Sequence, residues 1–398
     1  MYKLYCRLYQ AVMRLVAYLL PWRTPELIEG LSSFEKLIEV LQKGMIEKVL
    51  IVTDEGLVKR GLLDKLFKSL TEDGMEYALY DGTVPNPTTG NIEDGYEMYV
   101  DNNCEAIIAF GGGSPMDCAK GIGARVVNPN KSIMQMKGIL KVRKRLPLLI
   151  AIPTTAGTGS EATLAAVISD AESHIKYQVN DIVLIPRYAI LDQGLTTGLP
   201  AHITSTTGID ALTHAVEAYI GQSNTKSTKR LAQKAVRLIF NNIYTAYTHG
   251  DNMIARLSML RAAHYAGVSF TRAYVGYVHG IAHALGGQYG LPHGLAISIV
   301  LPYVLEYYGE AIHEQLAELA DASDIGADLS VEEKAAAFIA KVKELNTKMD
   351  IPRKVEELQE QDIPELTKRI LKESNPFYPV PVILGKKDIK TILHSLMA

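Results

Sequence analysis

The 398-residue sequence contains little cysteine, little tryptophan and no surplus of positive charge. Its three cysteines, Cys6, Cys104 and Cys118, are odd in number and no two form a C-x-x-C pair. This argues against a disulfide framework or a thiolate zinc site, so we expect a reducing compartment, the cytoplasm. The 41 Lys and Arg against 44 Asp and Glu give a net charge of −3, and we therefore expect no nucleic-acid partner.

The first 20 residues also lack an uninterrupted apolar run of membrane-spanning length, because Arg7 and Arg14 break it. Apolar residues recur there at helical spacing, and Pro21 ends the pattern; they are Leu4, Leu8, Val12, Leu15, Val16 and Leu19. We expect residues 1–23 to form a helical extension that docks on the body of the protein or on a second subunit. The alternative is a helix on a membrane surface. Of the two we favour docking, without a membrane partner, and we expect a homo-oligomer, a dimer.

Two regions of different character follow this extension. Residues 24–199 alternate between short β-rich runs, such as KVLIVTD at 48–54, and helical stretches, which predicts an α/β dinucleotide-binding domain with a largely parallel sheet. Residues 200–398 have helical patterns almost throughout, so we expect an all-helical second domain. Clefts between domains are favoured ligand sites, and we expect the active site there.

A glycine turn, GGGSPMDCAK at 111–120, follows one predicted strand. Ser114 is the expected N-cap of the next helix, with Pro115 in its first turn and Asp117 completing a capping box. Glycines allow backbone N–H groups to approach a phosphate, and a helix N-terminus favours the anion. The alternative is a capped turn without a ligand, since the G-x-G-x-x-G fingerprint is absent.

A second polar loop, PTTAGTGSEAT at 153–163, follows another predicted strand. Its hydroxyls suit contacts with phosphate or ribose; they belong to Thr154, Thr155, Thr158 and Ser160. Asp54 and Asn86 are each either turn residues or nucleotide contacts. Two such loops at the ends of neighbouring strands favour nucleotide binding.

Histidines and a carboxylate gather in two apolar segments, GIDALTHAVEAY at 208–219 and YVHGIAHALGGQYGLPHG at 277–294. Asp210 and His214 are spaced i, i+4, as are His279 and His283, so each pair shares a helical face. A lone helical histidine is usually structural, but burying this many ionisable groups without a metal would be costly. Nitrogen and oxygen ligands suit Fe(II) or Zn(II). Spacing alone leaves open which histidines bind the metal.

Together these four motifs resemble the iron-containing (group III) alcohol dehydrogenase family, within the dehydroquinate synthase-like superfamily, from about residue 25 onward. The resemblance implies NAD(P)-dependent alcohol/aldehyde interconversion with one divalent metal, Fe(II) favoured and Zn(II) the alternative. It implies the metal ligands Asp210, His214, His279 and His293. It places His283 near the nicotinamide, where it is our candidate catalytic residue as a proton relay; the alternative is that His283 only packs against the nicotinamide. The implied cofactor contacts are Asp54, Asn86, Gly112, Gly113, Ser114, Thr154, Thr155, Thr158 and Lys176, and we add Asp117 from the glycine-turn segment.

Two other functions compete with this one. A lyase-type cyclisation, as in dehydroquinate synthase, also uses NAD and a metal, but its polyanionic substrate requires basic residues, and the two metal segments contain no Lys or Arg. A non-enzymatic scaffold would explain the extension but not the ligand set. We therefore expect a small, weakly charged alcohol or aldehyde as substrate. We also expect NAD rather than NADP, because the Asp54 carboxylate would repel a 2′-phosphate.

Overall fold

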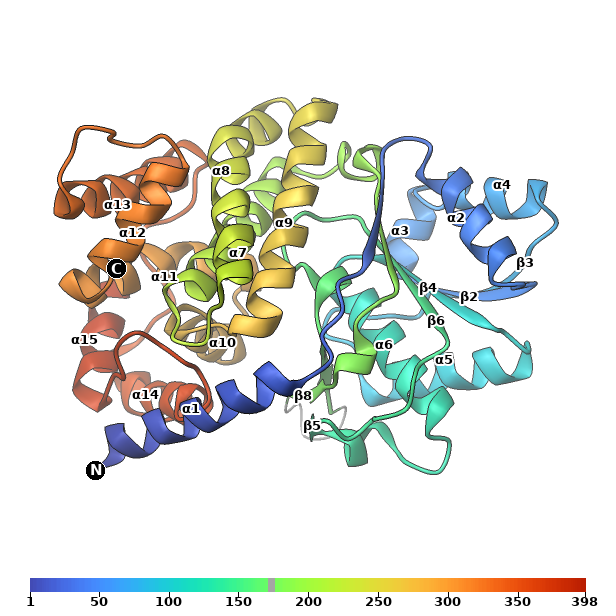
Figure 1. Ribbon diagram of the computed structural model, residues 1–398, viewed down its shortest axis with the longest axis horizontal. Coiled ribbons are helices and arrows are strands. Elements are labelled where there is room, and N and C mark those ends of the chain that lie inside the picture. Colours follow the sequence, from blue (N-terminus) through green and yellow to red (C-terminus); the bar gives the residue numbers. More distant parts are fainter. Residues whose placement is uncertain (171–175) are drawn as a thin grey trace. The chain divides into compact units, whose positions relative to one another are not determined.

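The computed structural model describes residues 1–170 and 176–398 and divides the chain into two compact units (Figure 1). One unit is Pro21–Gly198. The other joins Met1–Leu20 to Leu199–Ala398, so the N-terminal helix belongs with the second half of the chain.

The Pro21–Gly198 unit is built on a six-stranded, fully parallel sheet of order β1-β9-β6-β4-β2-β3. The strands are β1 (Glu26–Glu29), β2 (Lys48–Val52), β3 (Glu76–Tyr80), β4 (Ala106–Gly111), β6 (Leu148–Pro153) and β9 (Tyr188–Leu191). The helices between them are α2 (Ser33–Lys43), α3 (Glu55–Lys59), α4 (Asp64–Glu72), α5 (Thr89–Asp101) and α6 (Gly113–Val127). This confirms the predicted α/β class with a parallel sheet.

Both faces of this sheet are covered by apolar side chains, as parallel sheets require. Because successive strand residues point to opposite faces, Leu50 and Ile107 pack into one cluster with Ile122 of α6. Their neighbours on the strands, such as Ile108, pack into a second cluster with Phe34 of α2. The central strands β4 and β6 are therefore continuous apolar runs, and the charged residues of β1, β2 and β3 stand at strand ends: Glu26, Glu29, Lys48 and Glu76.

A second, smaller sheet of this unit has no counterpart in the sequence-based expectation. It has the order β5-β8-β7, with β5 (Gly138–Ile139), β7 (Ala165–Ser169) and β8 (Lys176–Asn180), and β7 pairs antiparallel with β8. Short 3₁₀ helices of this unit lie at Ile133–Met136, Ser160–Ala162, Ile182–Leu184 and Gln193–Thr196.

Helices make up the other unit, as predicted. They are α1 (Tyr2–Leu19), α7 (Ala201–Ile220), α8 (Lys226–Thr248), α9 (Met253–Ala273), α10 (Tyr277–Tyr289), α11 (His293–Tyr308), α12 (His313–Ala322), α13 (Val331–Lys348), α14 (Ile363–Ser374) and α15 (Lys386–Leu396), with 3₁₀ turns at Gly309–Ile312 and Glu360–Asp362. The stretch His293–Ala322 is long and apolar enough to cross a membrane by length and composition, but 61% of its apolar window is buried inside the fold. Such burial is typical of a core helix.

The N-terminal helix α1 ends before Pro21, as expected, but its apolar face does not pack against its own unit. Only Cys6 and Gln10 of α1 are buried. The predicted apolar stripe, which includes Leu4, Leu8 and Leu15, is exposed. The helix docks through its other side.

Candidate metal and cofactor sites

Four candidate metal ligands come from three helices of the helical unit. Asp210 and His214 lie one turn apart on α7, His279 is in the first turn of α10, and His293 is the first residue of α11. Asp210 Oδ1 lies 3.5 Å from His293 Nε2, 3.8 Å from His279 Nε2 and 3.9 Å from His214 Nδ1. Ligand atoms of Asp210, His279 and His293 all lie within 4.8 Å of one another. His214 falls outside this tighter group but faces the same carboxylate oxygen.

The protonation states of this cluster match those of metal ligands. Burial lowers the pKa of His214 to about 3, although Asp210 opposes the shift. Burial likewise lowers the pKa of His279 well below its ordinary value. For Asp210, burial acts to raise the pKa, but the facing histidines outweigh it and hold the pKa below its ordinary range. At neutral pH Asp210 is therefore a carboxylate anion beside the neutral imidazoles of His214 and His279.

Several ligand atoms of the cluster lack any other partner. Asp210 Oδ1, His214 Nδ1 and His279 Nε2 are buried and form no hydrogen bond within the described part of the chain. Buried polar atoms normally have hydrogen-bond partners, so three neighbouring atoms without one require an explanation. A bound divalent cation would explain them, because a metal ligand must offer a lone pair that is neither protonated nor used in a hydrogen bond. The residues fit a metal with nitrogen and oxygen ligands.

Glu217, which the sequence analysis did not single out, fixes the orientation of His279. Its carboxylate accepts hydrogen bonds from the backbone N–H groups of Gly276 and Val278, both at 2.8 Å. His279 Nδ1 lies 2.6 Å from Glu217 Oε2, so the ring proton is on Nδ1 and Nε2 is free to bind a metal. Burial raises the pKa of Glu217 to about 7, against the effect of the two backbone donors. The signal in the sequence was spacing, because Glu217 follows Asp210 by seven residues on the same face of α7.

His283 has a separate anchor. Its Nδ1 lies 2.6 Å from Glu373 Oε1 of α14, which also accepts a hydrogen bond from the Tyr378 hydroxyl at 2.7 Å. The His283 ring stacks on His293, with centroids 5.2 Å apart. His283 thus lies beside the metal candidates without joining the group around Asp210. Its catalytic role stays a prediction.

The candidate cofactor residues of the α/β unit lie at the carboxyl end of its sheet. Asp54 follows β2, Asn86 follows β3, Gly112 follows β4 and Thr154 follows β6, and these four strands are neighbours in the sheet. Carboxyl ends of parallel strands are the usual place for a dinucleotide. Asp54 also caps α3, because its Oδ1 accepts a hydrogen bond from Leu57 N at 3.0 Å.

The glycine turn and the threonine loop pack directly against each other. A Cβ on Gly112 would lie 3.4 Å from Thr155 Oγ1, and one on Gly113 would lie 3.1 Å from Thr158 Cγ2. Side chains larger than hydrogen would therefore crowd the space between turn and loop. A narrow cradle of backbone N–H groups and hydroxyls results, which suits a phosphate.

The predicted capping of α6 is wrong. The N-cap is Gly112, without a side-chain cap, and the helix begins at Gly113. Ser114 Oγ instead accepts a hydrogen bond from Asn86 N at 3.2 Å, because the chain after β3 comes close to it. Lys176 Nζ donates to Asn86 Oδ1 at 2.6 Å, so the structure brings Ser114, Asn86 and Lys176 together. The first N–H groups of α6 are left without a capping side chain.

Asp117 has a role inside the fold. Its two oxygens accept hydrogen bonds from Ser160 Oγ at 2.8 Å and from Val167 N at 3.1 Å. Lys120, which the sequence analysis did not single out, is fully buried and donates to Ser160, Thr163 and Ala165 over 2.7–2.9 Å. Burial lowers the pKa of Lys120 to about 8, against the opposing charges of Asp117 and Glu161. This cluster ties α6 to the threonine loop.

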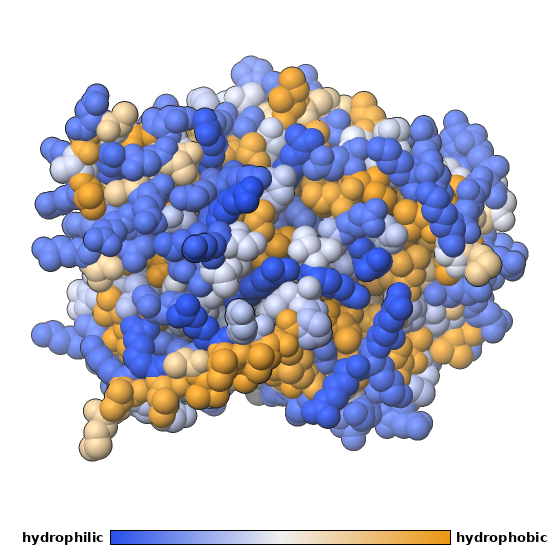
Figure 2. All heavy atoms as spheres, in the orientation of Figure 1, coloured by the Kyte–Doolittle hydropathy of each residue, from blue (hydrophilic) through white to orange (hydrophobic). Residues whose placement is uncertain are grey.

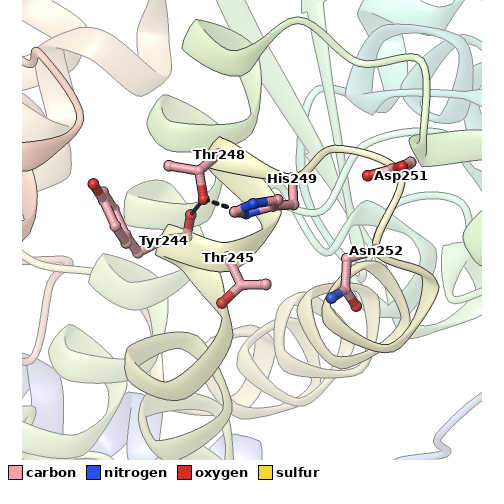
Figure 3. Close-up of a pocket in the computed structure, with 6 residues that line it drawn as sticks. All are labelled: Tyr244, Thr245, Thr248, His249, Asp251 and Asn252. Atoms are coloured by element: carbon pink, nitrogen blue, oxygen red, sulfur yellow. Dashed lines mark hydrogen bonds between the residues drawn. The ribbon is translucent and has the colours of Figure 1, made fainter.

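One pocket of the helical unit lies apart from these residues (Figure 3). It has a volume of about 550 Å³ and is lined by Tyr244, Thr245, Thr248, His249, Asp251 and Asn252, at the turn between α8 and α9. Thr248 Oγ1 and His249 Nδ1 form a hydrogen bond of 2.9 Å there. The lining includes none of the predicted ligands or cofactor contacts.

Comparisons with known proteins agree on one family. Residues 24–193 match iron-containing alcohol dehydrogenase, and residues 204–397 match the C-terminal domain of the Fe-containing alcohol dehydrogenase family. The 1,3-propanediol dehydrogenase of Klebsiella pneumoniae is 39% identical over 336 residues, covering 83% of this chain and 87% of that protein.

Solved structures agree as well. A crystal structure of 1,3-propanediol oxidoreductase superimposes with a TM-score of 0.89 at 36% identity, covering 94% of this chain and 98% of that one. Sulfoacetaldehyde reductase from Bifidobacterium kashiwanohense, solved in complex with NAD+, gives a TM-score of 0.85 at 26% identity, covering 95% and 98%.

Proposed function

Because the chain belongs to the iron-containing alcohol dehydrogenase family, and so interconverts alcohols and aldehydes, we propose that it uses NAD(H) and one divalent metal ion held by the helical unit. Fe(II) is the favoured metal and Zn(II) the alternative. The observation that supports the metal is the set of buried, unpaired ligand atoms around Asp210.

The residues that would hold the metal are Asp210, His214, His279 and His293. When bound, the metal supplies a Lewis acid for the substrate oxygen, and the nicotinamide supplies or accepts a hydride. The chain itself contributes orientation. Glu217 keeps the Nδ1 proton on His279, and the carboxylate of Asp210 is held ionised by its surroundings.

We assign proton movement to His283. Glu373 holds the ring at Nδ1, and this orients the imidazole that we propose exchanges a proton with the substrate hydroxyl or with water. An imidazole suits this task because its ordinary pKa lies near neutrality. The Tyr378 hydroxyl holds Glu373 in place, so the relay has a fixed orientation.

The cofactor proposal depends on the α/β unit. The N-terminus of α6, which has no side-chain cap, and the adjoining Thr155 and Thr158 suit the pyrophosphate. Asp54, at the end of the next strand, suits the ribose hydroxyls and disfavours a 2′-phosphate. A family relative has been solved with NAD+, which supports the same cofactor here.

The substrate we propose is a small, weakly charged alcohol or aldehyde, as for the 1,3-propanediol dehydrogenase relative. A cyclising lyase is disfavoured, because the two segments that carry the ligands contain no Lys or Arg for a polyanion. An assembly scaffold would not need the ligand set.

Metal analysis combined with a substrate screen tests the proposal. The purified protein is assayed for bound metal and for oxidation of NADH with a panel of small aldehydes, with Asp210→Asn as the matched variant. We expect about one metal per chain and turnover, both lost in Asp210→Asn. Undiminished turnover by metal-free protein, or no turnover with any aldehyde, would contradict the proposal.

A further inference from the structure

Helix α1 is held to the helical unit by its polar side. Its apolar residues, among them Leu8 and Leu15, are exposed, and Figure 2 shows them as a band along the helix. On the other side Arg7 and Gln10 lie one turn apart, and Gln10 is buried. Arg7 donates to Gln10 Oε1 at 2.9 Å, so the NH₂ group of Gln10 is directed to the rest of the unit.

These donors meet the segment PFYPVP at 376–381, which follows α14 beside α1 (Figure 1). It lies in no helix or strand. Its three prolines have no backbone N–H, so the segment cannot build a regular hydrogen-bonded element, and its carbonyls depend on donors from outside. Arg7 donates to the carbonyls of Val380 and Pro381, at 2.7 and 2.6 Å. One guanidinium therefore fixes the end of the segment.

The beginning of the segment connects α1 to His283. Gln10 donates to the carbonyls of Pro376 and Tyr378, at 3.2 and 2.8 Å. The Tyr378 hydroxyl in turn donates to Glu373 Oε1 at 2.7 Å, and His283 Nδ1 lies 2.6 Å from the same oxygen. Because both groups share one carboxylate oxygen, a shift of Tyr378 changes where Glu373 can hold the imidazole.

We propose that Arg7 and Gln10 are positioning residues for His283. By holding both ends of the segment they fix its tyrosine, and through Glu373 they set the orientation of the imidazole. The proposal rests on the proposed role of His283 in proton movement, but the geometry can be tested without it. A helix with a purely structural role would stabilise the unit without a specific effect on His283.

The ring proton of His283 reports on this geometry. Burial acts to raise the pKa of Glu373, but His283 and the Tyr378 hydroxyl outweigh it and lower the pKa. Glu373 is therefore a carboxylate, and His283 Nδ1–H donates to it. Such a proton gives a downfield resonance in proton NMR, which is assigned by its absence in His283→Gln. The full-length protein is measured with Zn(II), because this metal has a filled d shell and is diamagnetic.

The exchange of this proton with water is compared among variants. Arg7→Met and Gln10→Met each remove donors to the segment and test the same link independently. Tyr378→Phe removes only the hydroxyl that holds Glu373. Arg14→Met is the matched control, because Arg14 lies two turns beyond Arg7 on the same side of α1 but is exposed. Arg7→Lys is the conservative variant, because it keeps a charged donor.

We expect the His283 ring proton to exchange about tenfold faster in Arg7→Met and Gln10→Met, as in Tyr378→Phe. The rate in Arg14→Met should equal that of the wild type, and Arg7→Lys should restore most of the protection. Equal exchange in the wild type, Arg7→Met and Gln10→Met would overturn the proposal. An unchanged rate in Tyr378→Phe would overturn it as well, because the link runs through that hydroxyl.

Turnover separates this proposal from the proposed role of His283. If His283 moves the proton, Arg7→Met and Tyr378→Phe should each lower kcat about 10- to 100-fold with little change in KM. Since both act through one carboxylate, the double variant should be about as slow as the slower single variant, and additive losses would overturn the proposal. Faster exchange with an unchanged kcat would support the positioning and contradict the relay role of His283.

Discussion

Replacing Glu217 by glutamine tests how the helical unit prepares His279 for a metal. The carboxylate accepts three hydrogen bonds: Val278 N–H at Oε1, and Gly276 N–H and His279 Nδ1–H at Oε2. A glutamine has one acceptor oxygen, and its NH₂ group must replace the other. The substitution is nearly isosteric, so its effects report on hydrogen bonding.

Each orientation of the new amide loses something different. With NH₂ at the Oε1 position, the buried Val278 N–H has no acceptor, which costs about 1–3 kcal/mol of unfolding free energy. With NH₂ at the Oε2 position, the amide donates to His279 Nδ1, and the ring proton moves to Nε2, the atom that faces Asp210. That tautomer cannot bind a metal. We therefore expect Glu217→Gln to be destabilised by about 1–3 kcal/mol and to bind metal about 10- to 100-fold more weakly.

Chelator competition gives the metal affinity, and urea unfolding of the metal-free protein gives the stability. Glu373→Gln is the matched control, because Glu373 holds His283 rather than a proposed ligand. It should keep wild-type metal affinity. If Glu217→Gln binds metal as tightly as the wild type, or if Glu373→Gln loses as much, the argument from the tautomer is refuted.

Three further predictions concern other residues. His279→Ala and His293→Ala should lose metal and activity together, whereas His283→Ala should keep its metal and lose about 10²–10⁴-fold in rate. The measurement is the metal content of the purified variants. Loss of metal from His283→Ala alone would reverse the assignment. Asp54→Asn retains a capping oxygen but no charge, so it should reduce the preference for NADH over NADPH. In the wild type we expect this preference to be at least several-fold in kcat/KM. An unchanged ratio would contradict the role of Asp54 in cofactor selection. The pKa of Lys120 lies near 8 in the folded state against 10.5 ordinarily, so the unfolded chain binds more protons between these values and stability rises with pH there, by up to about 1.4 kcal/mol per pH unit. Urea unfolding should show this rise in the wild type relative to Lys120→Met, and equal pH dependence would refute it.

The sequence predicted the site where its motifs are local. Asp54, Gly112 and Thr154 each follow an apolar strand, and a parallel sheet brings such ends to one edge, so their proximity followed from the strand pattern. The spacing of Asp210 and His214 predicted a shared helical face in the same way. Spacing did not separate His279 from His283, which both lie on α10; the fold does, because only His279 comes within reach of Asp210.

Residues that act through distant partners were missed. Glu373 meets His283 across 90 residues, and Glu217 meets His279 across 62. The capping prediction at Ser114 was wrong for the same reason, because Asn86 supplies a competing donor from another loop. The periodicity of α1 identified a helix and its apolar face, but periodicity cannot say toward which side that face turns.

The discontinuous helical unit has a consequence for synthesis on the ribosome. Helix α1 leaves first, yet the carbonyls that hold Gln10 belong to residues made 366 and 368 positions later. At a synthesis rate of roughly 5–20 residues per second, the residues that hold α1 are made on the order of a minute after the helix itself. The α/β unit, Pro21–Gly198, is complete well before then, since β1 pairs with β9 at residues 188–191. During that interval α1 has no docking partner, so both its apolar face and its polar, positively charged side are exposed and accessible to chaperones.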